Sequence, residues 1–162
     1  MKGKIITIPI FMLFVATLFS CECIYEDGKE LAAEVNKYVP QISADSLKAK
    51  IERGDDFYLI DVRQPNEYRE GNIDVATLIP RGELEFLISD SIFWEEQFLY
   101  VPQKDNEIIV YSQTGNRGAL AAQALIQIGF KNVKNLTGGL NAYDPNYKTK
   151  SEPVEEGGGC GD

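Results

Sequence analysis

The fold of this chain is decided by the stretch Ser112-Gln113-Thr114-Gly115-Asn116-Arg117. An apolar run at residues 108–111 precedes it and is typical of a buried strand. The apolar spacing of residues 120–128, which follows, predicts an amphipathic helix. A strand that turns sharply into a helix leaves backbone N–H groups without acceptors at the positive end of the helix dipole. The sequence therefore predicts an anion-binding loop over residues 112–118.

Three residues of this loop have chemistry that suits an anion site. Gly115 allows the backbone to curl, because glycine adopts a positive φ without strain. Arg117 has a guanidinium group that either meets an anion or ties the loop to the sheet. Ser112 stands where the strand ends, and covalent chemistry on a bound anion needs a nucleophile at that point. Ser112 is thus the candidate catalytic residue, and the candidate anion-binding residues are Ser112, Gln113, Thr114, Gly115, Asn116, Arg117 and Gly118.

Predicted strands and helices alternate along most of the chain. Strands are expected at residues 57–62, 76–79, 108–111 and 133–136. Helices are expected at residues 31–38, 44–54, 65–70, 83–88, 92–99 and 120–128. This alternation predicts one α/β domain, with a parallel sheet covered by helices on both faces.

Two charged residues lie at the carboxyl end of the strand expected at residues 57–62. They are Asp61 and Arg63. The carboxyl ends of parallel strands meet at one edge of the sheet, where ligands bind in such folds, so both residues are expected near Ser112. They either pair with one another or with the loop backbone, or they contact the ligand. We therefore treat them as supporting residues of the site.

Several motifs, in order along the chain, resemble those of the rhodanese-like (sulfurtransferase) family. They are Leu-Ile-Asp-Val-Arg-Gln-Pro-Asn-Glu-Tyr at 59–68, Gly-Asn-Ile at 71–73, Ala-Thr-Leu-Ile-Pro at 76–80, the loop at 112–117, and Thr-Gly-Gly-Leu-Asn-Ala-Tyr at 137–143. The resemblance covers roughly residues 42–143. It implies a rhodanese-like domain at residues 42–147 with a sheet of about five parallel strands, and it implies no cofactor.

Two positions depart from the family pattern. In this family the loop usually reads Cys-x-x-Gly-x-Arg and its cysteine carries a persulfide, but the matching residue here is Ser112. Asn72 stands where histidine is common. A hydroxyl group does not carry sulfane sulfur, and the chain has no histidine to act as a general base for serine. We expect a module without sulfurtransferase activity that binds a small oxyanion, a sulfur compound or an envelope protein at the loop. The alternative is an active sulfurtransferase that uses another cysteine, such as Cys160.

The N-terminal segment is typical of a targeting signal. Lys2 and Lys4 precede an apolar run at residues 5–19, which is short for a membrane-spanning helix. The run ends in Leu18-Phe19-Ser20-Cys21, which is similar to the lipobox of bacterial lipoproteins. This resemblance implies a signal peptide at residues 1–20, lipidation of Cys21 and attachment to the periplasmic face of an envelope membrane, with Glu22 favouring the outer one. Ordinary secretion and an uncleaved anchor are the alternatives.

The net charge of −9 argues against binding to nucleic acid. A linker and lead-in helix are expected at residues 21–41, and an acidic, glycine-rich, disordered tail at 148–162. The thiols other than Cys21 belong to Cys23 and Cys160, and neither lies in an expected core element. They form a disulfide with each other, form one with a partner, or stay free. Without histidine and with a single thiol in the tail, we predict no metal site.

Overall fold

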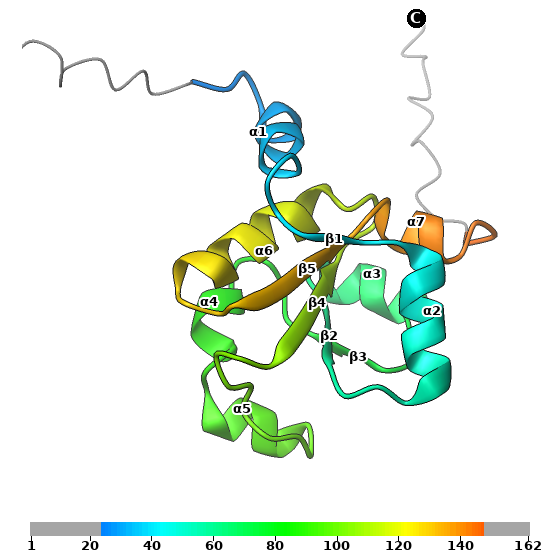
Figure 1. Ribbon diagram of the computed structural model, residues 1–162, viewed down its shortest axis with the longest axis vertical. Coiled ribbons are helices and arrows are strands. Elements are labelled where there is room, and N and C mark those ends of the chain that lie inside the picture. The colour runs from blue at the N-terminus through cyan, green and yellow to red at the C-terminus, as the bar shows by residue number, and fades with distance from the viewer. Residues whose placement is uncertain (1–23, 148–162) are drawn as a thin grey trace, which may run out of the picture.

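Strands and helices alternate throughout residues 24–147, the part of the chain that the computed structural model describes. The strands are β1 (Gln41–Ile42), β2 (Tyr58–Asp61), β3 (Ala76–Leu78), β4 (Glu107–Tyr111) and β5 (Asn132–Leu136). The helices are α1 (Gly28–Val35), α2 (Ala44–Arg53), α3 (Pro65–Glu70), α4 (Leu84–Leu87), α5 (Ser91–Glu96), α6 (Asn116–Gln127) and α7 (Gly139–Tyr143) (Figure 1). The predicted α/β class is confirmed, and β1 and α7 are additions to the predicted elements.

The five strands form one parallel sheet in the order β1-β5-β4-β2-β3. In a parallel sheet all carboxyl ends lie at the same edge, so residues that follow β2, β4 and β5 come together. Strand β4 lies in the middle, between β5 and β2. The loop that follows β4 is therefore placed at the centre of that edge.

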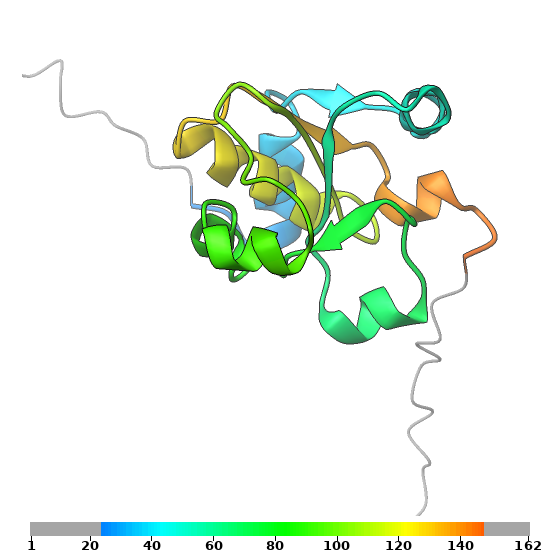
Figure 2. The same ribbon diagram turned by 90° about the horizontal axis from the view of Figure 1, so that it is seen from below.

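Helices cover both faces of the sheet, as Figures 1 and 2 show. Successive side chains of a strand point to opposite faces, and β4 shows this directly. Ile108 and Val110 pack into a core cluster with α1, α4, α5 and α6. Ile109 and Tyr111 pack into a second cluster with α2, α3 and α7. All members of both clusters lie between residues 31 and 147, so a chain that begins at Ile24 retains the complete core.

The helix boundaries follow from local capping. The Ser43 hydroxyl caps α2 by accepting a hydrogen bond from the N–H of Ser46, and Gly54, with φ +67°, is the C-cap that follows Arg53. Helix α1 starts earlier than predicted, because the Asp27 carboxylate accepts hydrogen bonds from the first turn. Helix α5 ends at Glu96 rather than at residue 99. Within residues 24–147, no helix has the length and apolar character needed to cross a membrane.

Candidate anion-binding site

The loop 112–118 connects β4 to α6 at the carboxyl edge of the sheet. Helix α6 starts at Asn116, earlier than predicted, directly after Gly115 with φ +88°. The Ser112 side chain is buried, with 1% of the residue exposed, and its Oγ accepts a hydrogen bond of 3.3 Å from the N–H of Gly118. The strand, the loop and the first turn of the helix therefore form one continuous, tightly folded unit.

The backbone of this loop carries unused hydrogen-bond donors. Within the described part of the chain, the N–H groups of residues 113–117 donate no hydrogen bond. They lie at the N-terminus of α6, a helix of 12 residues whose dipole places partial positive charge there. This arrangement suits an oxyanion, since it offers donors and positive potential without requiring a particular side chain.

The first turn of α7 supports the loop. Ser112 O accepts a hydrogen bond of 2.9 Å from the N–H of Leu140, and Gln113 O accepts one of 3.1 Å from the N–H of Asn141. Gly139 has φ +62°, and a Cβ atom at this position would lie 2.1 Å from Ser112 O. Only glycine allows the two backbones to approach this closely, so Gly139 fixes the position of the loop.

Asn135 supports the loop from β5. Its side chain is buried, and its Nδ2 donates to Gly115 O at 3.1 Å and to Asn36 Oδ1 at 3.0 Å. This residue is missing from the sequence-based candidates, although an uncharged polar residue near the end of the strand expected at 133–136 was a signal for it. A cavity of about 220 Å³ adjoins this network and is lined by Asn36, Gln41, Thr114, Gly115, Asn135, Thr137 and Gly138.

The predicted supporting residues Asp61 and Arg63 form a fully buried ion pair. Arg63 Nη2 lies 2.7 Å from Asp61 Oδ2 and also donates to Gly71 O at 2.7 Å. Arg63 Nη1 donates to Gln113 Oε1 at 3.0 Å. Burial by itself lowers the pKa of Arg63, but the hydrogen bonds and charge of Asp61 raise it above its ordinary value. Arg63 thus links the core of the domain to the loop and stays charged.

Arg117 points toward α3. Its Nη1 and Nη2 lie 2.6 and 2.5 Å from the two carboxylate oxygens of Glu67. The side chains are 38% and 21% exposed respectively. Hydrogen bonding from Arg117 is the main cause that lowers the pKa of Glu67. Because Glu67 balances this charge, the positive potential of the loop comes mainly from its N–H groups and the helix dipole. A direct contact between Arg117 and an anion remains a prediction.

The end of the described chain lies beside the loop. Tyr147 Oη lies 3.4 Å from Arg63 Nη1 and donates to Glu67 O at 3.4 Å, and its ring packs against Gly71. The described part of the chain therefore ends next to the site. Cys21, Cys23 and Cys160 lie outside the described residues. Between Ile24 and Tyr147, no cluster of three or more Cys, Asp and Glu side chains is arranged to hold a metal ion.

Residues 43–145 match the rhodanese-like domain family. The chain belongs to this family. YtwF of Bacillus subtilis, which carries the name of a sulfurtransferase, is 32% identical over 113 residues, covering 70% of this chain and 98% of its own. A mitochondrial relative from Schizosaccharomyces pombe, named as a thiosulfate sulfurtransferase, is 32% identical over 94 residues, which span 57% of this chain and 66% of the relative.

A solved rhodanese-like structure confirms the fold. The human single-domain sulfurtransferase TSTD1 superimposes with a TM-score of 0.61 at 26% identity, covering 68% of this chain and 99% of that protein. The five-stranded parallel sheet of the family is thus present here, with the 112–118 loop at its carboxyl edge.

Proposed function

We propose that this chain is an envelope-anchored rhodanese-like domain that lacks sulfurtransferase activity and binds a small oxyanion at the 112–118 loop. In this proposal Ser112 takes the position of the family's cysteine. The observation that carries the proposal is the set of unused N–H donors at residues 113–117 beside a buried serine hydroxyl. The donors would hold an anion whatever the side chain of residue 112, whereas a persulfide requires sulfur at that position.

The difference between a cysteine thiol and a serine hydroxyl explains how the loop can bind an anion without catalysing sulfur transfer. A helix N-terminus lowers the pKa of a thiol from about 8.5 to as low as about 3.5–7.5, which is sufficient to activate cysteine. A serine hydroxyl instead needs a neighbouring base, and the chain contains no histidine. In the described residues, Ser112 Oγ has one hydrogen-bond partner, the N–H of Gly118, which is a donor and no base.

Thiosulfate is expected to bind the chain from Ile24 onward and to shift the NMR amide signals of residues 113–117. The dissociation constant should be about millimolar, or about 4 kcal/mol of binding free energy, because few charged groups contribute. Arg117→Ala should weaken binding, since it leaves the Glu67 carboxylate unbalanced beside the loop. Adding Glu67→Gln to that variant should restore part of the affinity. Unmoved loop amides at tens of millimolar thiosulfate would contradict the proposal.

The same protein should show no sulfur transfer from thiosulfate to cyanide, whereas Ser112→Cys should gain it. In that reaction a thiolate takes the outer sulfur and releases sulfite, and cyanide then removes the sulfur as thiocyanate. This chain lacks Cys21 and Cys23, so native activity that survives Cys160→Ser would refute the proposed inactivity.

A second candidate function is sulfur transfer by Cys160. The position of Tyr147 favours it, because the chain leaves the described fold beside the loop. Cys160 follows Tyr147 by 160 − 147 = 13 residues, and a fully extended chain of that length reaches roughly 40 Å. The names of the relatives also favour sulfur transfer. Native activity that disappears in Cys160→Ser would support this candidate, and background activity in both proteins would exclude it.

The envelope location rests on the N-terminal segment and on charge. With a net charge of −9, the chain does not bind anionic lipid through a basic patch, so acyl chains on Cys21 would supply the attachment. Full-length protein is therefore expected to sediment with membranes, and Cys21→Ala should release it or block its maturation. A mature N-terminus at any residue other than Cys21 would contradict the lipoprotein assignment.

A further inference from the structure

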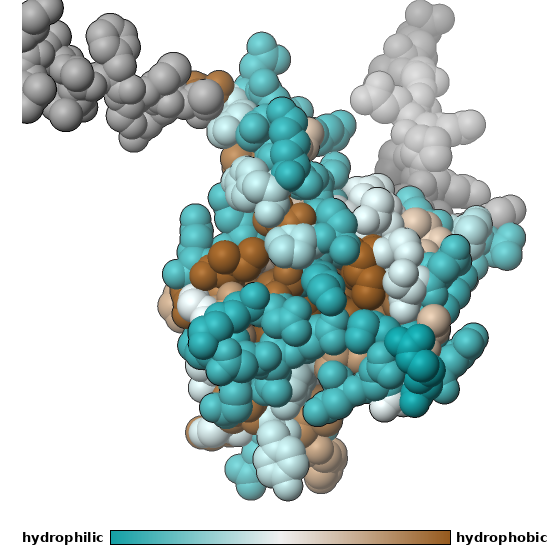
Figure 3. Space-filling model, in the orientation of Figure 1, coloured by the Kyte–Doolittle hydropathy of each residue, from teal (hydrophilic) through white to brown (hydrophobic). Residues whose placement is uncertain are grey.

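A run of exposed apolar side chains lies at the end of β4 opposite the 112–118 loop. Phe98 is 96% exposed, Leu99 46% and Tyr100 90%. With Val101 they form the Phe98–Val101 segment, which connects α5 to β4. Figure 3 shows pale and brown surface at this lower end of the molecule. Large apolar side chains grouped in this way mark interaction sites.

The backbone of the segment holds these side chains outward. Phe98 has φ +58°, the only positive φ of a non-glycine residue between Ile24 and Tyr147. Such a conformation is strained for a bulky residue. It is fixed by hydrogen bonds of 3.0 Å from the N–H of Leu99 to Trp94 O and from Tyr58 Oη to Tyr100 O. The segment is thus preorganised, which reduces the entropy lost when a partner binds.

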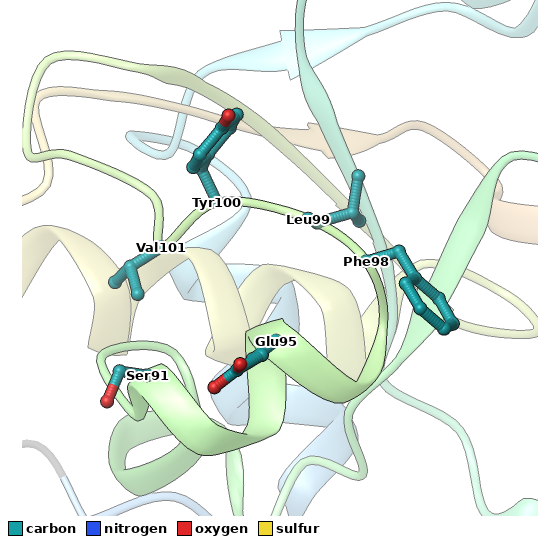
Figure 4. A pocket seen from close by; sticks show the side chains of 6 residues that line it. All are labelled: Ser91, Glu95, Phe98, Leu99, Tyr100 and Val101. Atoms are coloured by element: carbon teal, nitrogen blue, oxygen red, sulfur yellow. The ribbon is translucent and has the colours of Figure 1, made fainter.

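Two cavities flank the segment. The larger, of about 470 Å³, is lined by Ser91, Glu95, Phe98, Leu99, Tyr100 and Val101 (Figure 4). The other, of about 210 Å³, shares Leu99 and Tyr100 with the first and extends to Phe57 and Val75. Figure 4 shows the Phe98 and Tyr100 rings projecting in different directions from the loop, above Ser91 and Glu95 of α5. The cavities can accept side chains of a partner, and the exposed rings can insert into hollows on the partner's surface.

The negative charge of this surface favours a basic partner over a second copy of the chain or the chain's own acidic tail. Glu95 and Asp56 are the charged residues that line the two cavities, and both are acidic. A second copy would bring the same carboxylates and a net charge of −9 against them, and the chain's own tail carries Glu152, Glu155 and Glu156. The segment follows α5, which lies at the opposite end of the molecule from α1 (Figure 1).

We propose that the Phe98–Val101 segment docks a protein partner through an amphipathic stretch whose apolar side chains are flanked by lysine or arginine. An apolar side chain of the partner enters the larger cavity beside Phe98 and Tyr100, and a basic side chain pairs with Glu95. The interaction is independent of the 112–118 loop, because the two surfaces lie at opposite ends of β4.

Two 14-residue peptides with the same helical leucine pattern test this surface on the chain from Ile24 onward, which contains the complete core. One has lysine at all other positions and one has glutamate. The lysine peptide should bind, with NMR shifts centred on residues 91–101, and the glutamate peptide should bind at least tenfold more weakly. Phe98→Gly should weaken binding of the lysine peptide at least tenfold without lowering the thermal midpoint, since glycine relieves the positive φ.

Two further variants separate this surface from general attraction to an acidic protein. Phe86→Ser removes an aromatic ring that is 79% exposed but lines neither cavity, and it should change binding less than twofold. Glu95→Lys should reverse the preference between the two peptides. Shifts spread over the acidic surface, or affinity in Phe98→Gly within twofold of native, would overturn the proposal. Self-association of the chain that Phe98→Gly abolishes would also overturn it, because the occupant is then a second copy.

Discussion

Replacing Arg63 with methionine is expected to lower the free energy of unfolding by about 3–5 kcal/mol. The reason is that Asp61 and Arg63 are both fully buried, and the Asp61 carboxyl group would stay in the core without its guanidinium partner. The same change leaves Gly71 O and Gln113 Oε1 without their hydrogen-bond donor. Urea denaturation followed by tryptophan fluorescence measures the loss, because Trp94 is buried in the same domain.

Arg53→Met is the matched control for this variant. Arg53 also pairs with an aspartate, Asp55, but its side chain is 59% exposed, so its loss should cost less than about 1 kcal/mol. Replacing both Asp61 and Arg63 with apolar residues should recover much of the stability that Arg63→Met loses, because no unpaired charge then stays buried. Equal losses in Arg53→Met and Arg63→Met would show that burial of the Asp61–Arg63 pair does not set its energy.

Gly139→Ala is expected to disrupt the loop and to lower stability by about 2–5 kcal/mol. A left-handed conformation costs a non-glycine residue about 1–2 kcal/mol, and overpacking adds about 1–3 kcal/mol. The added Cβ would lie 2.1 Å from Ser112 O and 2.7 Å from Gly115 N, so the loop backbone must move. Amide signals of residues 113–117 should shift without any ligand, and thiosulfate binding should fall below detection.

Gly54→Ala separates the conformational cost from the clash. Gly54 has φ +67°, close to that of Gly139, but a Cβ atom added at Gly54 would have no other atom within 4 Å. This variant should therefore lose only about 1–2 kcal/mol and bind thiosulfate normally. If the two alanine variants behave alike in both stability and binding, Gly139 does not position the loop.

Much of the fold is predictable from local patterns. The apolar run at residues 108–111 and the helical spacing after it identify β4 and α6, because one central strand buried on both faces leaves an unbroken apolar stretch. Ser43 and Gly54 mark the ends of α2 through capping chemistry that acts within a few residues. Strand β1 has two residues and is held by pairing with β5, so its own sequence contains no strand pattern. The pair Gly138-Gly139 indicates a turn and conceals the short α7 that follows it.

The sequence predicts where the residues of the candidate site lie in the fold, but not how their side chains pair. The loop 112–118 and the pair Asp61 and Arg63 could be identified because each lies at the carboxyl end of a strand. The partner of Arg117 is Glu67, 50 residues earlier in the chain, and a single sequence does not reveal such a pairing. Tyr147 is missed for the same reason, since it reaches Arg63 only through the path of the folded chain.

The donors at residues 113–117 belong to the main chain, and this determines how the site tolerates mutation. Gln113, Thr114 and Asn116 can be replaced by other residues without loss of a backbone N–H group. Proline is the exception, because it has no backbone N–H. Substitutions should be least tolerated at the residues that fix the backbone path, namely Gly115, Asn135 and Gly139. In the proposed function, recognition of the anion depends on the main chain and reaction with it depends on the side chain of residue 112, so a substitution at that position can remove one and leave the other.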